Sequence, residues 1–221
     1  MNLLDVIGPV MIGPSSSHTA GAVRLGLLAK AILGEPVVQV EIGLHGSFAV
    51  TYKGHGTDMA LLAGLMGWMP DDARIPEASK YAEQAGLAYS FITINLGELA
   101  HPNTVRFALV GKEGTRCVVV GSSIGAGQVV VSAIDDFPVE LSGKLPAVLV
   151  VHKDRPGVIA KVSSVLAEAK VNIAGMRVYR DNKGGSATMI LECDQAVPTE
   201  ALTRIETLDN VVSVRFVNNV Q

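Results

Sequence analysis

In the last third of the sequence, the hydrophobic pattern predicts six elements in the order strand, helix, strand, strand, helix, strand. The first helix of this part, residues 157–169, is amphipathic, because Val158, Val162 and Val165 recur at helical spacing on one face. Two strand–helix–strand units in about 75 residues are typical of the ferredoxin-like split βαβ arrangement. Strands are predicted at 147–151, 171–179, 186–193 and 211–217, and the second helix at 199–207.

The first two thirds of the sequence mix helices and strands differently. Residues 20–33 predict a helix that is apolar nearly all round, which is typical of a buried helix. Residues 135–146 contain prolines, a glycine and several charges, and so predict a domain boundary. The expected fold is α+β, with an N-terminal α/β domain at 1–140 and a ferredoxin-like βαββαβ domain at 147–221. The other predicted elements are helices at 58–66 and 76–85, strands at 37–44, 91–96, 105–110, 115–120 and 129–134, and loops at 7–19 and 45–56.

The charge pattern excludes several classes of partner. The formal net charge is -3 and the chain has no basic block, so neither nucleic acid nor an anionic membrane is expected as a partner. The most apolar stretch, residues 59–69, is too short to span a bilayer. The start of the sequence lacks the basic region of a secretory signal, which predicts a cytoplasmic location.

The cysteine content limits what metal chemistry this chain can support alone. The two cysteines, Cys117 and Cys193, cannot supply the four ligands that an iron–sulfur cluster normally needs. Both lie on apolar strand segments, so we expect buried, reduced thiols. No metal ligands are therefore predicted in this chain.

The connection from the strand at 147–151 to the helix at 157–169 has the composition of a helix start. Asp154 predicts an N-cap, Pro156 presets the first turn, and Gly157 lets the backbone approach another group closely. A helix N-terminus can hold a carboxylate through its free N–H groups. A capped helix with no ligand is the alternative interpretation.

The run His152-Lys153-Asp154-Arg155-Pro156-Gly157, with Val171-Asn172-Ile173 further on, resembles the ACT domain. That family regulates amino-acid enzymes by binding amino acids at such loops, usually where two copies pair. The resemblance implies self-association through this domain and an amino-acid effector, with serine the natural guess. The effector-binding residues that it implies are Asp154, Pro156, Gly157, Val158 and Ile159, with Asn172 opposite.

A loop near the start of the chain is rich in hydrogen-bonding groups. Between a Gly-Pro turn and the buried helix lie three serines, a histidine and a threonine. Their hydroxyls and the first N–H groups of the helix could surround a carboxylate. His18 has an ordinary pKa near 6.5, which suits proton transfer, and Arg24 could pair with an anion. Alternatively, Ser17 or Thr19 is only an N-cap and His18 only bonds a carbonyl.

The same loop carries a second resemblance. The run Gly13-Pro14-Ser15-Ser16-Ser17-His18-Thr19, with Gly21 and Arg24, resembles the signature of the iron–sulfur L-serine dehydratases. In their two-chain form, a beta chain carries this motif and an ACT domain, and an alpha chain carries the cysteines for a [4Fe-4S] cluster. The segment between motif and ACT domain resembles an allosteric substrate-binding domain also found in some phosphoglycerate dehydrogenases.

This resemblance implies a function and assigns residues to it. L-serine would lose its hydroxyl and α-proton in an α,β-elimination that ends in pyruvate and ammonia, with the cluster of the alpha subunit as Lewis acid on the hydroxyl. Ser15, Ser16, Ser17 and Thr19 would bind the substrate. His18 would be the catalytic residue, either as acid–base or by orienting the carboxylate. A stand-alone amino-acid-sensing module without catalytic activity is the alternative.

Other polar segments leave their roles open. The run 121–127 is rich in glycine and serine but lacks the Lys-Ser/Thr ending of a phosphate loop, so we expect a turn or a loop facing the partner. His45 and His55 lie in glycine-rich loops, and a pair of imidazoles that binds a metal ion is one interpretation of them. The resemblance makes this region a second ligand loop. His101 is expected in a turn.

Overall fold

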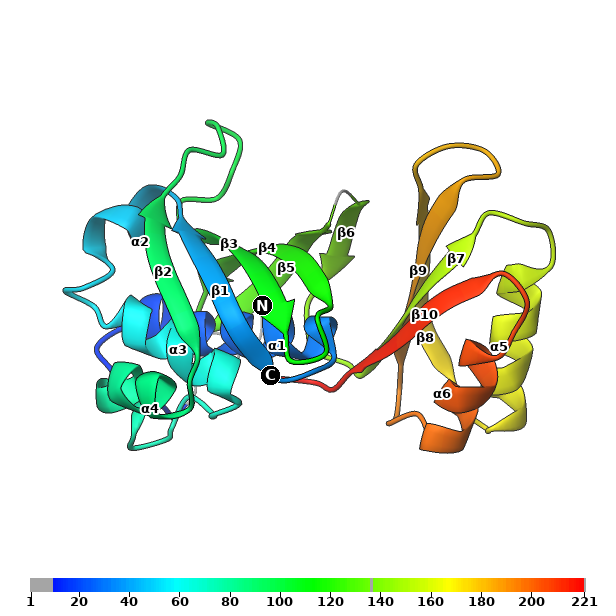
Figure 1. Cartoon of the computed structure of the whole chain (residues 1–221), viewed down its shortest axis with the longest axis horizontal. Helices are drawn as coiled ribbons and strands as arrows, with labels where there is room; N and C mark the ends of the chain where they lie inside the picture. Colours follow the sequence, from blue (N-terminus) through cyan, green and yellow to red (C-terminus); the bar gives the residue numbers. More distant parts are fainter. Residues whose placement is uncertain (1–9, 136, 221) are drawn as a thin grey trace. The chain divides into compact units, whose positions relative to one another are not determined.

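The computed structural model describes residues 10–135 and 137–220. This part of the chain divides into two compact units (Figure 1). The first holds the residues up to 135 with 140–142 and Val220, and the second holds 137–139 and 143–219. Within the described residues, no helix combines the length and the apolar character that crossing a membrane requires.

The first unit is built on a six-stranded sheet with the order β2-β1-β3-β4-β5-β6. β1 and β2 are parallel, whereas β3, β4 and β5 continue the sheet from β1 as antiparallel neighbours. Apolar residues alternate along the strands: Val105, Phe107 and Leu109 of β3 are buried on one face. The strands are β1 (Val37–Leu44), β2 (Ala88–Thr93), β3 (Thr104–Gly111), β4 (Arg116–Gly125), β5 (Gln128–Ile134) and β6 (Phe137–Leu141).

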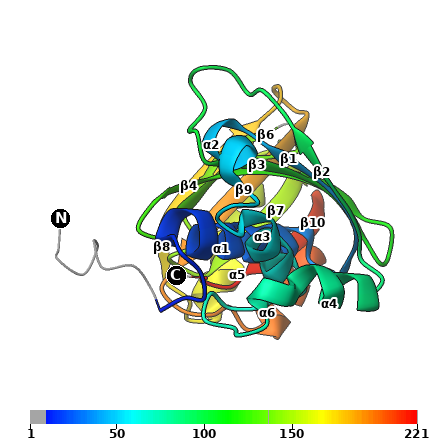
Figure 2. The ribbon, with the colours of Figure 1, turned by 90° about the vertical axis from the view of Figure 1, so that its left-hand side faces the viewer.

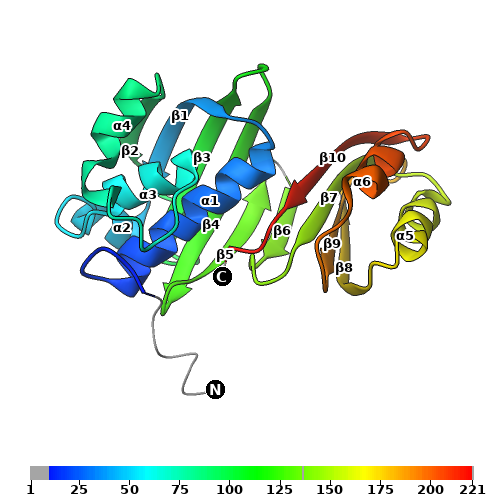
Figure 3. The ribbon, with the colours of Figure 1, turned by 90° about the horizontal axis from the view of Figure 1, so that it is seen from below.

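Helices cover one face of this sheet, and α1 lies across β4 and β5 (Figure 3). α1 is buried nearly all round, as its sequence predicts. α3 packs directly on α1, where Gly26 and Gly64 face each other: a Cβ built on Gly64 would lie 2.1 Å from the carbonyl oxygen of Val23. The helices are η2 (Ser16–Ala20), α1 (Gly21–Leu33), α2 (Gly46–Thr51), α3 (Thr57–Met66), η3 (Ile75–Glu77) and α4 (Ala78–Gln84).

The second unit is the predicted ferredoxin-like βαββαβ fold. Its four strands form an antiparallel sheet in the order β10-β7-β9-β8, and α5 and α6 pack on one face of that sheet (Figure 1). The core between them includes Val150, Val162, Leu191 and Ile205. The elements are β7 (Ala147–Lys153), α5 (Val158–Glu168), β8 (Ile173–Arg180), β9 (Ser186–Cys193), α6 (Thr199–Glu206) and β10 (Val211–Val217).

Three local predictions were wrong, and tertiary contacts explain two of them. The predicted loop at 45–56 contains α2, which begins at Gly46 (φ +57°) packed on Pro102. The predicted loop at 7–19, of which residues 7–9 lie outside the described residues, contains the start of the π-helix η2. β4 continues through Ser122 and Ser123 because both pair with β5. Within the predicted boundary at 135–146, residues 137–141 form the short strand β6, and the change from the first unit to the second falls in this segment.

The contact between α1 and α3 yields a stability prediction. We expect Gly64→Ala to lower the free energy of unfolding by about 2 kcal/mol, because the added methyl group must push the two helix backbones apart. The measurement is urea unfolding followed by circular dichroism. Gly54→Ala is the matched control, since a Cβ there meets only Thr51 O at 3.6 Å. Equal stability of the two variants would show that the helices do not need this close contact.

Candidate functional site

The hydroxyl-rich loop forms a π-helix that continues without a break into α1. Ser15 caps it: its Oγ accepts a hydrogen bond from His18 N at 3.2 Å. The wider turn is closed by Gly21 N, which donates to Ser16 O. Ser15, and neither Ser17 nor Thr19, is therefore the N-cap. Short π-helices of this kind are often found at functional sites.

The imidazole of His18 lies at the centre of the site. Its Nε2 is 3.1 Å from Ser47 Oγ on α2, and its Nδ1 is 3.4 Å from Ser15 Oγ. The rings of Phe48 and His55 pack edge-on against it, with centroids 5.3 and 4.9 Å away. The site therefore joins η2, α2 and the loop before α3.

The surroundings of His18 favour its neutral form. Burial lowers the pKa of its imidazole below the ordinary value, and the neighbouring His55 lowers that pKa further. Because the ring is neutral at neutral pH, one nitrogen is free to accept a proton. Its two hydroxyl partners, Ser15 and Ser47, can each donate or accept, so they support either tautomer.

The predicted substrate-binding residues divide into two groups. Ser15, Ser16 and Ser17 are partly exposed, and their contact with substrate stays a prediction. Thr19 is only 1% exposed, and its Oγ1 donates to His55 O at 3.4 Å. Gly13 packs directly on it, since a Cβ there would lie 2.4 Å from Thr19 Cγ2. Thr19 therefore links the loop to the segment that carries His55.

Arg24 is directed toward the protein interior. Its Nη1 donates to Gly127 O at 2.6 Å, and burial lowers the pKa of its guanidinium. This bond connects α1 to the β4–β5 turn, where Gly127 follows Ala126 with a positive φ of 49°. Among the described residues, Arg24 Nε is buried without a hydrogen-bond partner.

Sequence reasoning missed several residues of the site. Ser47 and Phe48 were noted only as part of a glycine-rich run, yet both contact His18. Ser122 and Ser123 were expected in a turn, but lie on β4. Ser122 Oγ is 2.7 Å from Thr104 Oγ1, and Ser123 occupies the space where a side chain on residue 21 would stand.

The other histidines of the first unit bond to loop backbone. His45 Nδ1 accepts from Leu96 N at 3.3 Å, and His101 Nδ1 accepts from Asn103 N at 3.1 Å. In the residues that the structure describes, no three His, Cys, Asp or Glu side chains are grouped to hold a metal ion. Cys117 and Cys193 are both buried, and burial raises the pKa of Cys193 to about 11. The two buried cysteines therefore do not fit the four-ligand set of a [4Fe-4S] cluster.

In the second unit, Asp154 does not cap the helix as predicted. Gly157, with a φ of +89°, is the residue before α5, and no side chain caps that helix. Asp154 Oδ2 instead accepts from Gly184 N at 3.0 Å and pairs with Arg180 Nη1 at 3.1 Å. These two bonds hold the pKa of the Asp154 carboxyl below its usual range, and the bond from Gly184 N has the larger effect. Asp154 therefore fixes the loop to the β8–β9 hairpin.

The other predicted effector residues lie at two ends of the same sheet. Pro156, Gly157 and Ile159 are exposed beside Asp154, whereas Val158 is buried. Asn172 lies at the opposite end, where its Nδ2 donates to Asp194 Oδ2 at 2.6 Å. One chain alone does not bring the loop and Asn172 together, so a joint site in two paired copies stays a prediction.

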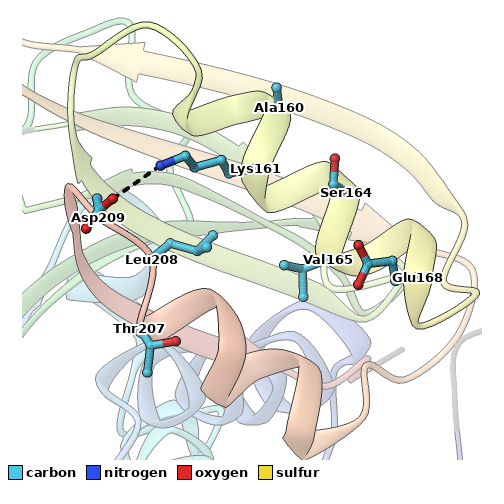
Figure 4. Close-up of a pocket in the computed structure, with 8 residues that line it drawn as sticks. All are labelled: Ala160, Lys161, Ser164, Val165, Glu168, Thr207, Leu208 and Asp209. Atoms are coloured by element: carbon cyan, nitrogen blue, oxygen red, sulfur yellow. Dashed lines mark hydrogen bonds and ion pairs between the residues drawn. The ribbon is translucent and has the colours of Figure 1, made fainter.

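A separate groove of about 480 Å³ runs between α5 and the segment from α6 to β10 (Figure 4). Val165 and Leu208 lie between the two walls, and Lys161 crosses to Asp209 at 3.3 Å. None of the predicted effector residues lines this groove. Its lining residues are Ala160, Lys161, Ser164, Val165, Glu168, Thr207, Leu208 and Asp209.

The fold and the site together define a two-unit protein of the ACT-domain class. The ACT domain family matches residues 147–210, and the family described as serine dehydratase beta chain matches residues 3–98. The chain is 40% identical to "Probable L-serine dehydratase, beta chain" of Bacillus subtilis (strain 168) over 96% of each chain. It is 38% identical to "L-serine dehydratase, beta chain" of Peptoniphilus asaccharolyticus, again over 96% of each chain.

The chain therefore belongs to the family of L-serine dehydratase beta chains. It is also 27% identical to "D-3-phosphoglycerate dehydrogenase" of Bacillus subtilis (strain 168), over 88% of this chain and 37% of that protein. This match spans both units, in keeping with the expected likeness of the first unit to a domain of such dehydrogenases.

The environment of His18 yields a titration prediction. We expect NMR titration of its imidazole to give a pKa below the ordinary value of about 6.5. His55→Gln should raise that pKa, because an uncharged side chain replaces one that repels the imidazolium. Lys112→Ala, on the exposed β3–β4 turn, should leave it unchanged. A His18 pKa that is the same with and without His55 would refute this assignment.

The lowered pKa also fixes the direction of the pH dependence of stability. The unfolded chain binds a proton at His18 more readily than the folded one, so folding is favoured most when the ring is neutral in both states. The stabilisation that comes from the neutral ring is complete above the ordinary pKa of histidine. It is lost as pH falls through the lower pKa that His18 has in the folded state. The free energy of unfolding should therefore decrease on acidification, and decrease less in His18→Gln.

Proposed function

We propose that this chain is the beta subunit of an L-serine dehydratase that converts L-serine to pyruvate and ammonia by α,β-elimination. The alpha subunit of this enzyme would carry a [4Fe-4S] cluster. The observation that carries the proposal is the position of His18, a neutral imidazole between the hydroxyls of Ser15 and Ser47, in a chain that matches named beta chains over nearly its whole length.

Each part of the loop has a role in this proposal. The hydroxyls of Ser15, Ser16 and Ser17 hold the substrate carboxylate, helped by the free N–H groups where the helix begins. The neutral His18 removes the α-proton, with Ser47 holding the ring in place. The competing role for His18 is to orient the carboxylate. The described residues of this chain do not fit the cluster, which in this proposal belongs to the alpha subunit.

The activity prediction uses the assembled enzyme. The chain is co-expressed anaerobically with a cluster-bearing alpha chain, and pyruvate formation from L-serine is measured. We expect His18→Gln to lower kcat by about 10²-fold or more, because an amide can bond Ser47 but cannot transfer a proton. Lys112→Ala serves as control. If His18→Gln keeps kcat and raises KM alone, His18 orients substrate.

Inactivity of the wild-type pair would contradict the catalytic proposal as a whole. Binding of L-serine by the chain without any pyruvate formation would instead support the alternative function, an amino-acid-sensing module with no catalytic role. The two functions are therefore separated by measuring binding and turnover on the same preparation.

We further propose that the ACT unit senses an amino acid, with L-serine the first candidate, between two paired copies. β8 is one of the two edge strands of its sheet, and within the described residues it pairs only with β9. Its side chains Met176 and Val178 are 42% and 39% exposed. An edge strand with exposed apolar residues is suited to self-association. Pairing of two copies would also allow one chain's Asn172 to approach the other's loop.

The effector prediction concerns Asp154. We expect Asp154→Ala to weaken L-serine binding by about tenfold or more, because the loop before α5 loses its bonds to Gly184 and Arg180. Isothermal titration calorimetry of the isolated chain gives the affinity. Asp209→Ala removes another exposed, paired carboxylate from the same unit and should have no effect. Equal affinities in both variants would exclude this loop as the effector site.

A further inference from the structure

Four exposed apolar side chains surround the segments that carry His18. Leu99 is fully exposed and Val50 is 83% exposed, while Ile124 and Leu96 are 50% and 37% exposed. Exposed apolar residues that gather in one place commonly mark a protein–protein contact. These four residues, Val50, Leu96, Leu99 and Ile124, are called the site rim below.

Val50 is connected to His18 through one helix. It lies three residues after Ser47 on α2, so both side chains lie on the same side of that helix. Ser47 bonds His18, and Phe48 packs on it. A molecule that covered Val50 would therefore contact the helix that carries two neighbours of the imidazole, Ser47 and Phe48.

Leu96 and Leu99 belong to the loop from β2 to β3, which packs on the start of α2. Leu96 N donates to His45 Nδ1 at 3.3 Å, immediately before that helix. Pro102, at the other end of the loop, accepts from Phe48 N at 3.4 Å. The loop that carries Leu99 extends beyond the sheet near α2, the helix that carries Val50 (Figure 1).

Ile124 completes the rim from β4. Its neighbour Ser123 donates its backbone N–H to Asn103 O at 3.0 Å, which joins the end of β4 to the end of the same loop. Figure 2 looks onto this end of the first unit, where the start of α1, α2 and the β2–β3 loop face the viewer. The four rim residues thus come from connected segments.

The charge of these segments fits a buried contact. Between Gly43 and Thr57 the only charged residue is Lys53, and between Ile94 and Thr104 it is Glu98. Depletion of charge around exposed apolar side chains is the composition found at the centre of protein interfaces.

We propose that the site rim is the surface on which the alpha subunit docks, next to the segments that carry His18. This inference rests on the proposed function, in which the partner completes the site. A second copy of this chain is the rival occupant, but it would bring only another serine loop to His18. The exposed apolar residue Val38 lies near the start of β1, at the opposite end of that strand from His45.

The test measures the affinity of the beta chain for the cluster-bearing alpha chain under anaerobic conditions. We expect Leu99→Glu and Val50→Glu each to raise the Kd at least tenfold, with kcat recovered when the alpha chain is in excess. Val38→Glu is the matched control and should bind as wild type. Circular dichroism checks folding, and Leu99→Ser and Val50→Ser provide milder changes at the same positions.

An unchanged Kd in both rim variants overturns the inference, while pyruvate formation by the wild-type pair would leave the proposed function standing. A wild-type pair that binds but forms no pyruvate refutes the proposed function, and the rim is then judged on the Kd alone. If the rim variants change the mass of the isolated beta chain and leave the alpha-chain Kd unaltered, the rim is a contact between two beta chains and the inference fails.

Discussion

The direct contact between the backbones of α1 and α3 is the constraint on which the first unit depends. Gly26 and Gly64 leave no side chain between the two helices, so their positions are fixed closely. The π-helix with His18 leads into α1, and the segment with His55 leads into α3. The hydrogen bond from Thr19 to His55 O joins these two starts. The site is therefore assembled by helix packing, with the loops held at the ends of a rigid pair.

Elements with a strong hydrophobic period were predictable, and those fixed by distant contacts were not. β1 and β9 have the predicted bounds, and α1 and α5 agree within one residue, because alternation and helical spacing are local signals. α2 depends on Pro102, far along the chain, and the π-helix depends on a wide turn that no composition signals. His18 and its serines were found because they are adjacent in sequence. Ser47 joins them only in space.

Asp154 shows how a correct motif can carry a wrong local interpretation. An acidic residue before a helix is a common N-cap, but here the carboxylate reaches the β8–β9 hairpin and Gly157 starts the helix with its positive φ. The loop is consequently held by a partner 26 residues later, Arg180. Any ligand at this loop would be sensed by the hairpin as well as by the helix.

The π-helix at Ser16–Ala20 contains one residue more per turn than an α-helix would need over the same rise. Removing Ala20 would keep every hydroxyl and the imidazole, but the turn from Ser16 to Gly21 would then close with the bonds of an α-helix, and its side chains would project in different directions. The contact of His18 Nε2 with Ser47 Oγ would then be lost. The geometry of the site thus depends on the number of residues in this segment as well as on their chemistry. Insertions or deletions would be more damaging here than most substitutions.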